Sequence, residues 1–147
     1  METQNGVRAN RDVCIGSAAA LSAVAGFIHL VVAPEHFHEW WGYGTFFLVV
    51  GLAQVVYGSG VLARPRPPLL VVGIVGNLAI IAFWAWTRAV GIPLFGPGAN
   101  EREAVGTIDV ISEATEGALI VVLAMLLRSH TAPGRAGSLG KHAHNRV

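Results

Sequence analysis

The chain has 147 residues, of which 53% are hydrophobic and 13% charged, and its net charge is +1. Because soluble domains carry about 25% charged residues, this composition excludes an ordinary water-exposed globular surface. The balanced charge also gives no sign of a nucleic-acid partner. The apolar residues form four long blocks, and about 20 apolar residues cross the hydrocarbon core of a bilayer. We therefore predict an all-α fold, a four-helix transmembrane bundle with up-down topology.

Short connections separate the four predicted spans. The first span should end at Pro34, which cannot donate a backbone hydrogen bond. Trp40 and Trp41 in the first connection suit a membrane interface. The second connection, at 64–68, contains three prolines in four positions and should be a stiff turn. We predict helices at about 13–33, 44–63, 69–90 and 104–127, which form a transmembrane domain at 13–127 between a polar N-terminal segment at 1–12 and a disordered tail at 128–147.

Lysine and arginine are distributed unevenly between the two sides of the predicted bundle. Of the ten in the chain, only Arg88 and Arg102 lie near the first or third connection. The others lie in the N-terminal segment, the second connection and the tail. Cytoplasmic segments of membrane proteins carry this excess of positive residues. We therefore predict a multi-pass protein of the cell (plasma) membrane with both termini in the cytoplasm.

Polar side chains gather in the outer half of the predicted bundle and at its midplane. At 1.5 Å per residue, His29 lies about one turn below the outer end of the first span. Asp109, Glu113 and Glu116 recur at helical spacing and should form one stripe on the fourth span. The predicted residues of an intramembrane binding pocket are His29, Gln54, Asn77, Arg88, Asp109, Glu113 and Glu116.

The first span carries a row of small residues, Ala18, Ser22 and Gly26, at every fourth position. Rows of this kind let membrane helices approach one another closely. Since His29 lies three residues after Gly26, we expect it to point into the bundle.

The acids of the fourth span need partners. A charged side chain near the bilayer centre costs about 2.5–3.5 kcal/mol. The acids must therefore face the bundle interior or water, and the cations in reach are Arg88, Arg102 and His29. With so few cations, we expect at least one acid to carry a proton. Such groups either form a functional site or only fix helix packing, and the sequence leaves both open.

The segment after Pro34 suggests a metal site as well. Glu35 and His38 have the spacing Glu-x-x-His of di-iron carboxylate sites, but such sites need the motif twice. A broader site for a divalent transition metal is open, because histidine with carboxylate suits zinc, iron or copper(II). Its candidate ligands are His29, His36, His38, Glu113 and Glu116. The alternative is that residues 35–39 form an exposed polar loop.

Two stretches of the sequence carry a resemblance to a known family. One covers His29 to Trp40 and continues to Gln54, and the other covers 86–97 and continues through Gly106 to Glu116. Over about residues 20–127 the chain resembles a family of small, uncharacterised four-helix integral membrane proteins of high-GC bacteria. The resemblance implies the four-helix topology and no particular reaction.

Three hypotheses for the function follow. The first is an outward-facing His/carboxylate pocket that binds a metal ion or protons in support of transport or redox. Its core would be His29, Glu113 and Glu116, with Asp109 and Arg88 as the gate. The second is a structural or assembly subunit of a membrane complex, in which buried ion pairs only fix helix packing.

The third hypothesis, an enzyme that acts on a small lipid-soluble substrate, is the least favoured. The sequence has no nucleotide-binding loop and no catalytic triad with recognisable spacing. Four short helices are few for an independent transporter. We therefore expect a homo-oligomer or a larger membrane complex.

Overall fold

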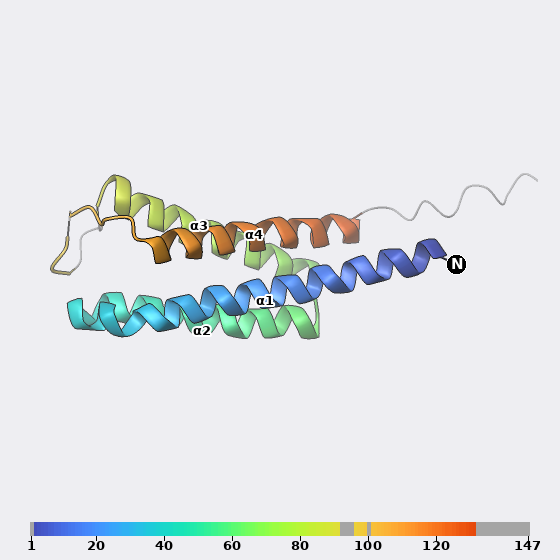
Figure 1. Cartoon of the computed structure of the whole chain (residues 1–147), viewed down its shortest axis with the longest axis horizontal. Coiled ribbons are helices and arrows are strands. Elements are labelled where there is room, and N and C mark those ends of the chain that lie inside the picture. The colour runs from blue at the N-terminus through green and yellow to red at the C-terminus, as the bar shows by residue number, and fades with distance from the viewer. Residues whose placement is uncertain (1, 92–95, 100, 132–147) are drawn as a thin grey trace, which may run out of the picture.

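The computed structural model describes residues 2–91, 96–99 and 101–131, and Figure 1 shows its long helices side by side. In chain order the helices are α1 (Glu2–Glu39), α2 (Trp41–Ala63), α3 (Pro67–Ala89) and α4 (Thr107–Thr131). All four are long and apolar enough to cross a membrane, which confirms the predicted all-helical chain with four spans. This architecture indicates a multi-pass membrane protein. The predicted tail lies outside the described residues from position 132 onward, and 128–131 belong to α4.

Helix α1 is longer than the first predicted span at both ends, with 38 residues. The prediction that it ends at Pro34 is wrong, because Pro34 lies inside the helix and α1 continues to Glu39. Proline removes one backbone donor, but membrane helices tolerate this loss where neighbouring groups compensate for it. The extended backbone of Trp40 separates α1 from α2 instead. His36 and His38 therefore lie on the last turns of a helix and not in a loop.

The connection between α2 and α3 is shorter than the turn that the sequence predicts. Residues 64–66 are non-helical, and α3 begins at Pro67. A proline at the start of a helix costs little, because its missing N–H would have no helical partner and its φ already suits the helix. Pro67 and Pro68 therefore start α3 and do not interrupt it.

The four helices pack unequally. α1 lies against α2 and also contacts α4, and α3 contacts α4, whereas α2 and α3 scarcely touch although they are consecutive. In Figure 1 the N-terminus and the end of α4 lie toward one end of the molecule, and the junction of α1 with α2 lies at the other. Arg11 and His130 join the first of these ends, with 3.1 Å between Nη2 and Nε2. The chain thus forms two helix pairs that are joined through α1 and α4.

Glycine brings α1 and α2 together. A Cβ atom on Gly26 would lie 2.7 Å from the carbonyl oxygen of Gly51, and one on Gly51 would lie 2.9 Å from that of Gly26. Ala18 and Ser22, the other members of the predicted row of small residues, are fully buried. Small residues permit this close approach of two backbones in a membrane. The row therefore faces α2 and fixes the side of α1 that points into the bundle.

The substitution Gly26→Ala should test this contact. We expect it to lower the free energy of unfolding by about 1–3 kcal/mol, because the new methyl group has no room against the backbone of α2. The measurement is unfolding of the purified protein in mixed detergent micelles. The matched control is Gly16→Ala on the same helix, where a Cβ atom meets nothing within 4 Å. Equal effects of the two substitutions would contradict the close approach.

An apolar cluster fills the half of the bundle near the N-terminus of α3 and the C-terminus of α4. All four helices contribute to it, and its centre is fully buried. Leucine dominates because its side chain fills the space between helices without any polar atom that would need a partner. The buried core residues are Ala18, Val61, Leu70, Leu119, Leu123 and Leu126.

Candidate functional site

Every helix places a polar side chain in the middle of the bundle, beyond the leucine cluster. His29 on α1, Gln54 on α2, Asn77 on α3 and Glu116 on α4 are buried, with relative exposures of 5%, 5%, 4% and 0%. The sequence analysis assigned all four to the intramembrane pocket, and the structure brings them into one network. Burial of this many polar groups is costly unless each finds a partner, so the contacts of the network decide what it can do.

His29 and Glu116 face one another across the bundle. The Nε2 atom of His29 lies 3.8 Å from Oε1 of Glu116, which is within the range of an ion pair but longer than a hydrogen bond. Both side chains are almost fully buried, at 6% and 0% exposure. A charged group in such surroundings needs an opposite charge or a proton.

The other ring nitrogen of His29 determines the tautomer. Nδ1 lies 2.9 Å from the carbonyl oxygen of Ala25, one turn earlier on α1. A carbonyl oxygen can only accept, so Nδ1 carries a hydrogen and donates it. A neutral His29 therefore presents the lone pair of Nε2 to Glu116, and a protonated His29 presents an N–H. This anchoring of one nitrogen leaves the other free for a proton or a ligand.

Two amide side chains position Glu116 from the opposite side. Gln54 donates from Nε2 to Oε1 of Glu116 at 2.9 Å and approaches Oδ1 of Asn77 at 3.4 Å. Asn77 donates from Nδ2 to the carbonyl oxygen of Gly73 at 2.8 Å. Oε1 of Glu116 is thereby fixed, whereas Oε2 is buried with no hydrogen-bond partner among the described residues. The carboxyl group thus keeps one oxygen available.

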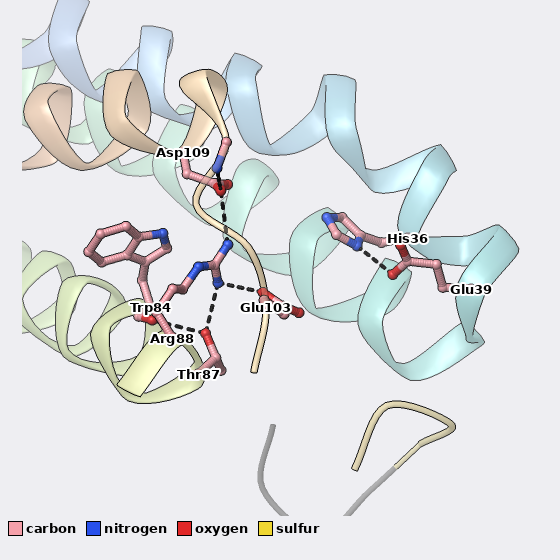
Figure 2. Close-up of polar contacts among 8 residues, drawn as sticks. His36, Glu39, Trp84, Thr87, Arg88, Glu103 and Asp109 are labelled. Atoms are coloured by element: carbon pink, nitrogen blue, oxygen red, sulfur yellow. Dashed lines mark hydrogen bonds and ion pairs between the residues drawn. The ribbon is translucent and has the colours of Figure 1, made fainter. Parts of the chain in front are cut away.

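Arg88, in the last turn of α3, is the centre of a second polar cluster (Figure 2). Its Nη2 donates to Oδ2 of Asp109 at 3.0 Å, and its Nη1 contacts Oε2 of Glu103 and donates to Oγ1 of Thr87 at 2.7 Å. Oδ2 of Asp109 also accepts from the backbone N–H of Gly106 at 2.8 Å, just before α4 begins. One guanidinium group therefore ties α3 to the start of α4 through two carboxylates.

A cavity of about 320 Å³ lies between this cluster and the network around Glu116. All four helices line it, and His29 belongs both to its wall and to the buried pair. Glu113, one turn before Glu116, also lines the cavity, and its Oε2 is buried without a hydrogen-bond partner in the described part of the chain. Of the seven residues of the predicted pocket, His29, Arg88, Asp109 and Glu113 line this cavity, whereas Gln54, Asn77 and Glu116 do not.

The two histidines beyond Pro34 have different surroundings. His36 lines the cavity, stacks on Phe47 with 4.0 Å between ring centroids, and has Nδ1 3.0 Å from Oε2 of Glu39. His38 is exposed. In Figure 2 the pair of His36 and Glu39 lies apart from the residues around Arg88.

The predicted metal ligands do not gather at one point. Within residues 2–91, 96–99 and 101–131, no group of three or more His, Cys, Asp or Glu side chains is placed to hold a metal ion. Of the predicted metal ligands, His29 and Glu116 form a close pair, which could supply two ligands to a metal ion. Metal binding therefore stays a prediction that would require an additional ligand.

Glu103 and Phe47 are among the contributors to the site that were not predicted from the sequence. Glu103 contacts Arg88, while its neighbour Arg102, which was expected to pair with an acid, is exposed. Phe47 touches both cavity histidines, with its ring 5.7 Å from that of His29. The sequence does contain an indication that His36 lines the cavity. His29 and His36 are seven residues apart and therefore share a face of a continuous helix.

These observations define a class of protein: an all-helical, multi-pass membrane protein with a buried His–Glu pair next to a cavity. Comparison of the chain with known protein families, with curated proteins and with solved structures found no match. Its function must therefore be argued from the site itself.

Proposed function

We propose that the chain is an up-down four-helix protein of the plasma membrane that binds a proton at His29 and Glu116, in support of transport or redox. Both termini lie in the cytoplasm, because the segments rich in lysine and arginine lie at that end. The cavity then opens outward. A homo-oligomer or a larger membrane complex is the expected assembly, since four helices are few for an independent transporter.

The hydrogen bond of His29 Nδ1 to Ala25 is the observation that carries the proposal. Because Nδ1 already bears a hydrogen, a neutral histidine beside an ionised Glu116 would set a lone pair against a carboxylate. One additional proton removes this conflict, either as an imidazolium beside a carboxylate or as a neutral imidazole beside a carboxyl group. The pair is therefore built to hold one proton that both groups share.

Glu113 gives this proton a route to the cavity. Glu113 and Glu116 are three residues apart on α4, so they are neighbours on one helix face. Glu113 and His29 both line the cavity, whereas Glu116 lies behind its wall. A proton that enters from the cavity therefore reaches Glu116 through His29 or Glu113, both of which are able to accept and release it.

The substitution Glu116→Gln should abolish the shared proton. Glutamine keeps the size of the side chain but cannot ionise, so the infrared band of a buried carboxyl group or the NMR signal of a protonated His29 should disappear. The measurement is infrared and ¹⁵N NMR spectroscopy of the purified protein in lipid bilayers. Glu101→Gln is the control, because Glu101 is exposed. Unchanged spectra in Glu116→Gln would exclude the proton site.

Elemental analysis of the wild-type protein and of His29→Ala distinguishes a metal site from the proposed proton site. A stoichiometric metal in the wild type that is lost in His29→Ala would replace the proton site with a metal site. A metal-free wild type leaves the proton site as proposed.

A purely structural role is the second candidate, and the cluster around Arg88 favours it. This cluster joins α3 to the start of α4 through the ion pairs of Arg88 with Glu103 and Asp109. In a structural or assembly subunit the His29–Glu116 pair would act in the same way. Glu116→Gln would then lower the stability of the protein, whereas in a proton-binding site it should remove the bound proton and leave the protein folded.

A further inference from the structure

Aromatic side chains form a large part of the cavity wall. Six of them other than histidine line it, and they come from the residue between α1 and α2, from α2 and from α3. Aromatic faces at a cavity wall favour a flat, apolar ring that can stack on them. The lining aromatic residues are Trp40, Tyr43, Phe46, Phe47, Phe83 and Trp84.

Four polar atoms of the cavity residues have no hydrogen-bond partner among the described residues. Two are donors, Nε1 of Trp84 and Nε of Arg88, and one is the acceptor Oε2 of Glu113. The fourth, Oγ of Ser112, can act as either. All four residues line the cavity. Because buried polar atoms normally have partners, this set calls for a ligand with oxygen atoms that accept from N–H groups and a hydroxyl that donates.

The charges around the cavity exclude an anion. Glu103, Asp109 and Glu113 line it together with a single arginine, Arg88. The Nη atoms of Arg88 are already held by Asp109 and Glu103. A negatively charged ligand would have to displace these carboxylates and then lie beside them. A neutral ligand can take the N–H of Trp84 without disturbing the ion pairs.

A path from the lipid leads between α2 and α3. These two helices scarcely touch, although both line the cavity. Phe46 and Phe83 bridge the gap between them, with 5.1 Å between ring centroids. Phe83 is 40% exposed on the surface that a bilayer would cover. A lipid-soluble molecule that entered from this side would displace the rings of Phe46 and Phe83.

From these observations we infer that the cavity binds a neutral, lipid-soluble ring that bears carbonyl or hydroxyl oxygens, the chemical class of quinones and quinols. The volume of about 320 Å³ is at the lower end for ligand cavities, so it accepts one ring system while a long tail remains in the lipid. Carbonyl oxygens accept from Trp84 and Arg88, and a quinol hydroxyl donates to Glu113. This inference does not depend on a proton at Glu116, because the side chain of Glu116 does not line the cavity.

The test is calorimetric titration of the full chain in lipid nanodiscs with menadione and with its quinol, after subtraction of binding to empty nanodiscs. We expect saturable binding of both forms. Trp84→Phe should weaken the binding of both by about tenfold, because it removes a hydrogen-bond donor and keeps an aromatic ring. Trp86→Phe is the matched control, since Trp86 is 53% exposed and does not line the cavity.

A second variant, Glu113→Leu, removes the acceptor oxygens, so it tests the hydroxyl contact and protects against a folding artefact. The substitution should weaken the binding of the quinol more than that of the quinone, because only the quinol donates a hydrogen bond to the oxygen of Glu113. A misfolded protein would lose the binding of both forms alike. Absence of saturable binding, or equal losses in Trp84→Phe and Trp86→Phe, would overturn the inference. Saturable binding of tetraphenylphosphonium in place of menadione would also overturn it and would assign the cavity to lipophilic cations.

Discussion

Replacing Arg88 with methionine should lower the free energy of unfolding by about 2–3 kcal/mol. Methionine keeps an apolar stem like that of arginine but leaves the carboxylates of Asp109 and Glu103 without their cation. Breaking a fully buried ion pair costs about 3–5 kcal/mol, and partial exposure reduces this cost here. The side chains of Arg88, Asp109 and Glu103 are 17%, 25% and 33% exposed.

Unfolding in mixed detergent micelles measures this loss, and the matched control is Arg102→Met. Arg102 is exposed, so its replacement should change the stability by less than about 0.5 kcal/mol. High salt should leave the difference between the two variants largely intact, because buried pairs are screened weakly. A loss in Arg102→Met as large as that in Arg88→Met would contradict the assigned role of the Arg88 cluster.

Replacing Gln54 with leucine should lower the free energy of unfolding by a similar amount, about 2–3 kcal/mol, but for a different reason. Leucine fills the space, but Oε1 of Glu116 then loses the donor that lies 2.9 Å away. A buried acceptor without a partner costs about 1–3 kcal/mol, and more when it is charged. The loss should be partly reversed in the double variant Gln54→Leu with Glu116→Leu, because the unpaired oxygen is then absent.

The comparison of the double variant with the two single variants gives the coupling energy between Gln54 and Glu116. Ser59→Ala on the same helix is the control, since Ser59 is exposed and its hydroxyl donates to the carbonyl oxygen of Val55. Strictly additive effects of the two leucine substitutions would mean that the side chains do not interact.

The sequence predicts the spans well because hydrophobic blocks report directly on membrane crossing. It also predicts that His29, Gln54, Asn77 and Glu116 lie in one region of the bundle, because Gln54, Asn77 and Glu116 fall near the midplane of their spans and His29 falls in the outer half of its span. Pro34 shows the limit of local signals. A proline rule derived from isolated helices cannot include the neighbouring helix and the bilayer, which favour continued helix over unpaired backbone.

The partners of the polar residues were harder to predict than their depth. Arg88 was expected to meet an acid, but Glu103 lies outside the predicted stripe and reaches Arg88 only because the chain folds back before α4. His36 and His38 differ by two residues, which turns them toward different sides of the helix. Which of them lines the cavity depends on the continuity of α1 through Pro34, and that continuity was not expected.

The leucine cluster has a consequence for the electrical behaviour of the chain. It occupies the bundle next to Glu116 with side chains that offer no hydrogen-bonding atom, from Leu119 to Leu126 on α4 and Leu70 on α3. If Glu116 binds a proton as proposed, this apolar layer would separate that proton from the aqueous phase at the other end of the bundle. Net movement of charge would demand that the leucine layer itself rearrange. Coupling of the proposed proton site to a partner would therefore have to act on that layer, directly beside Glu116.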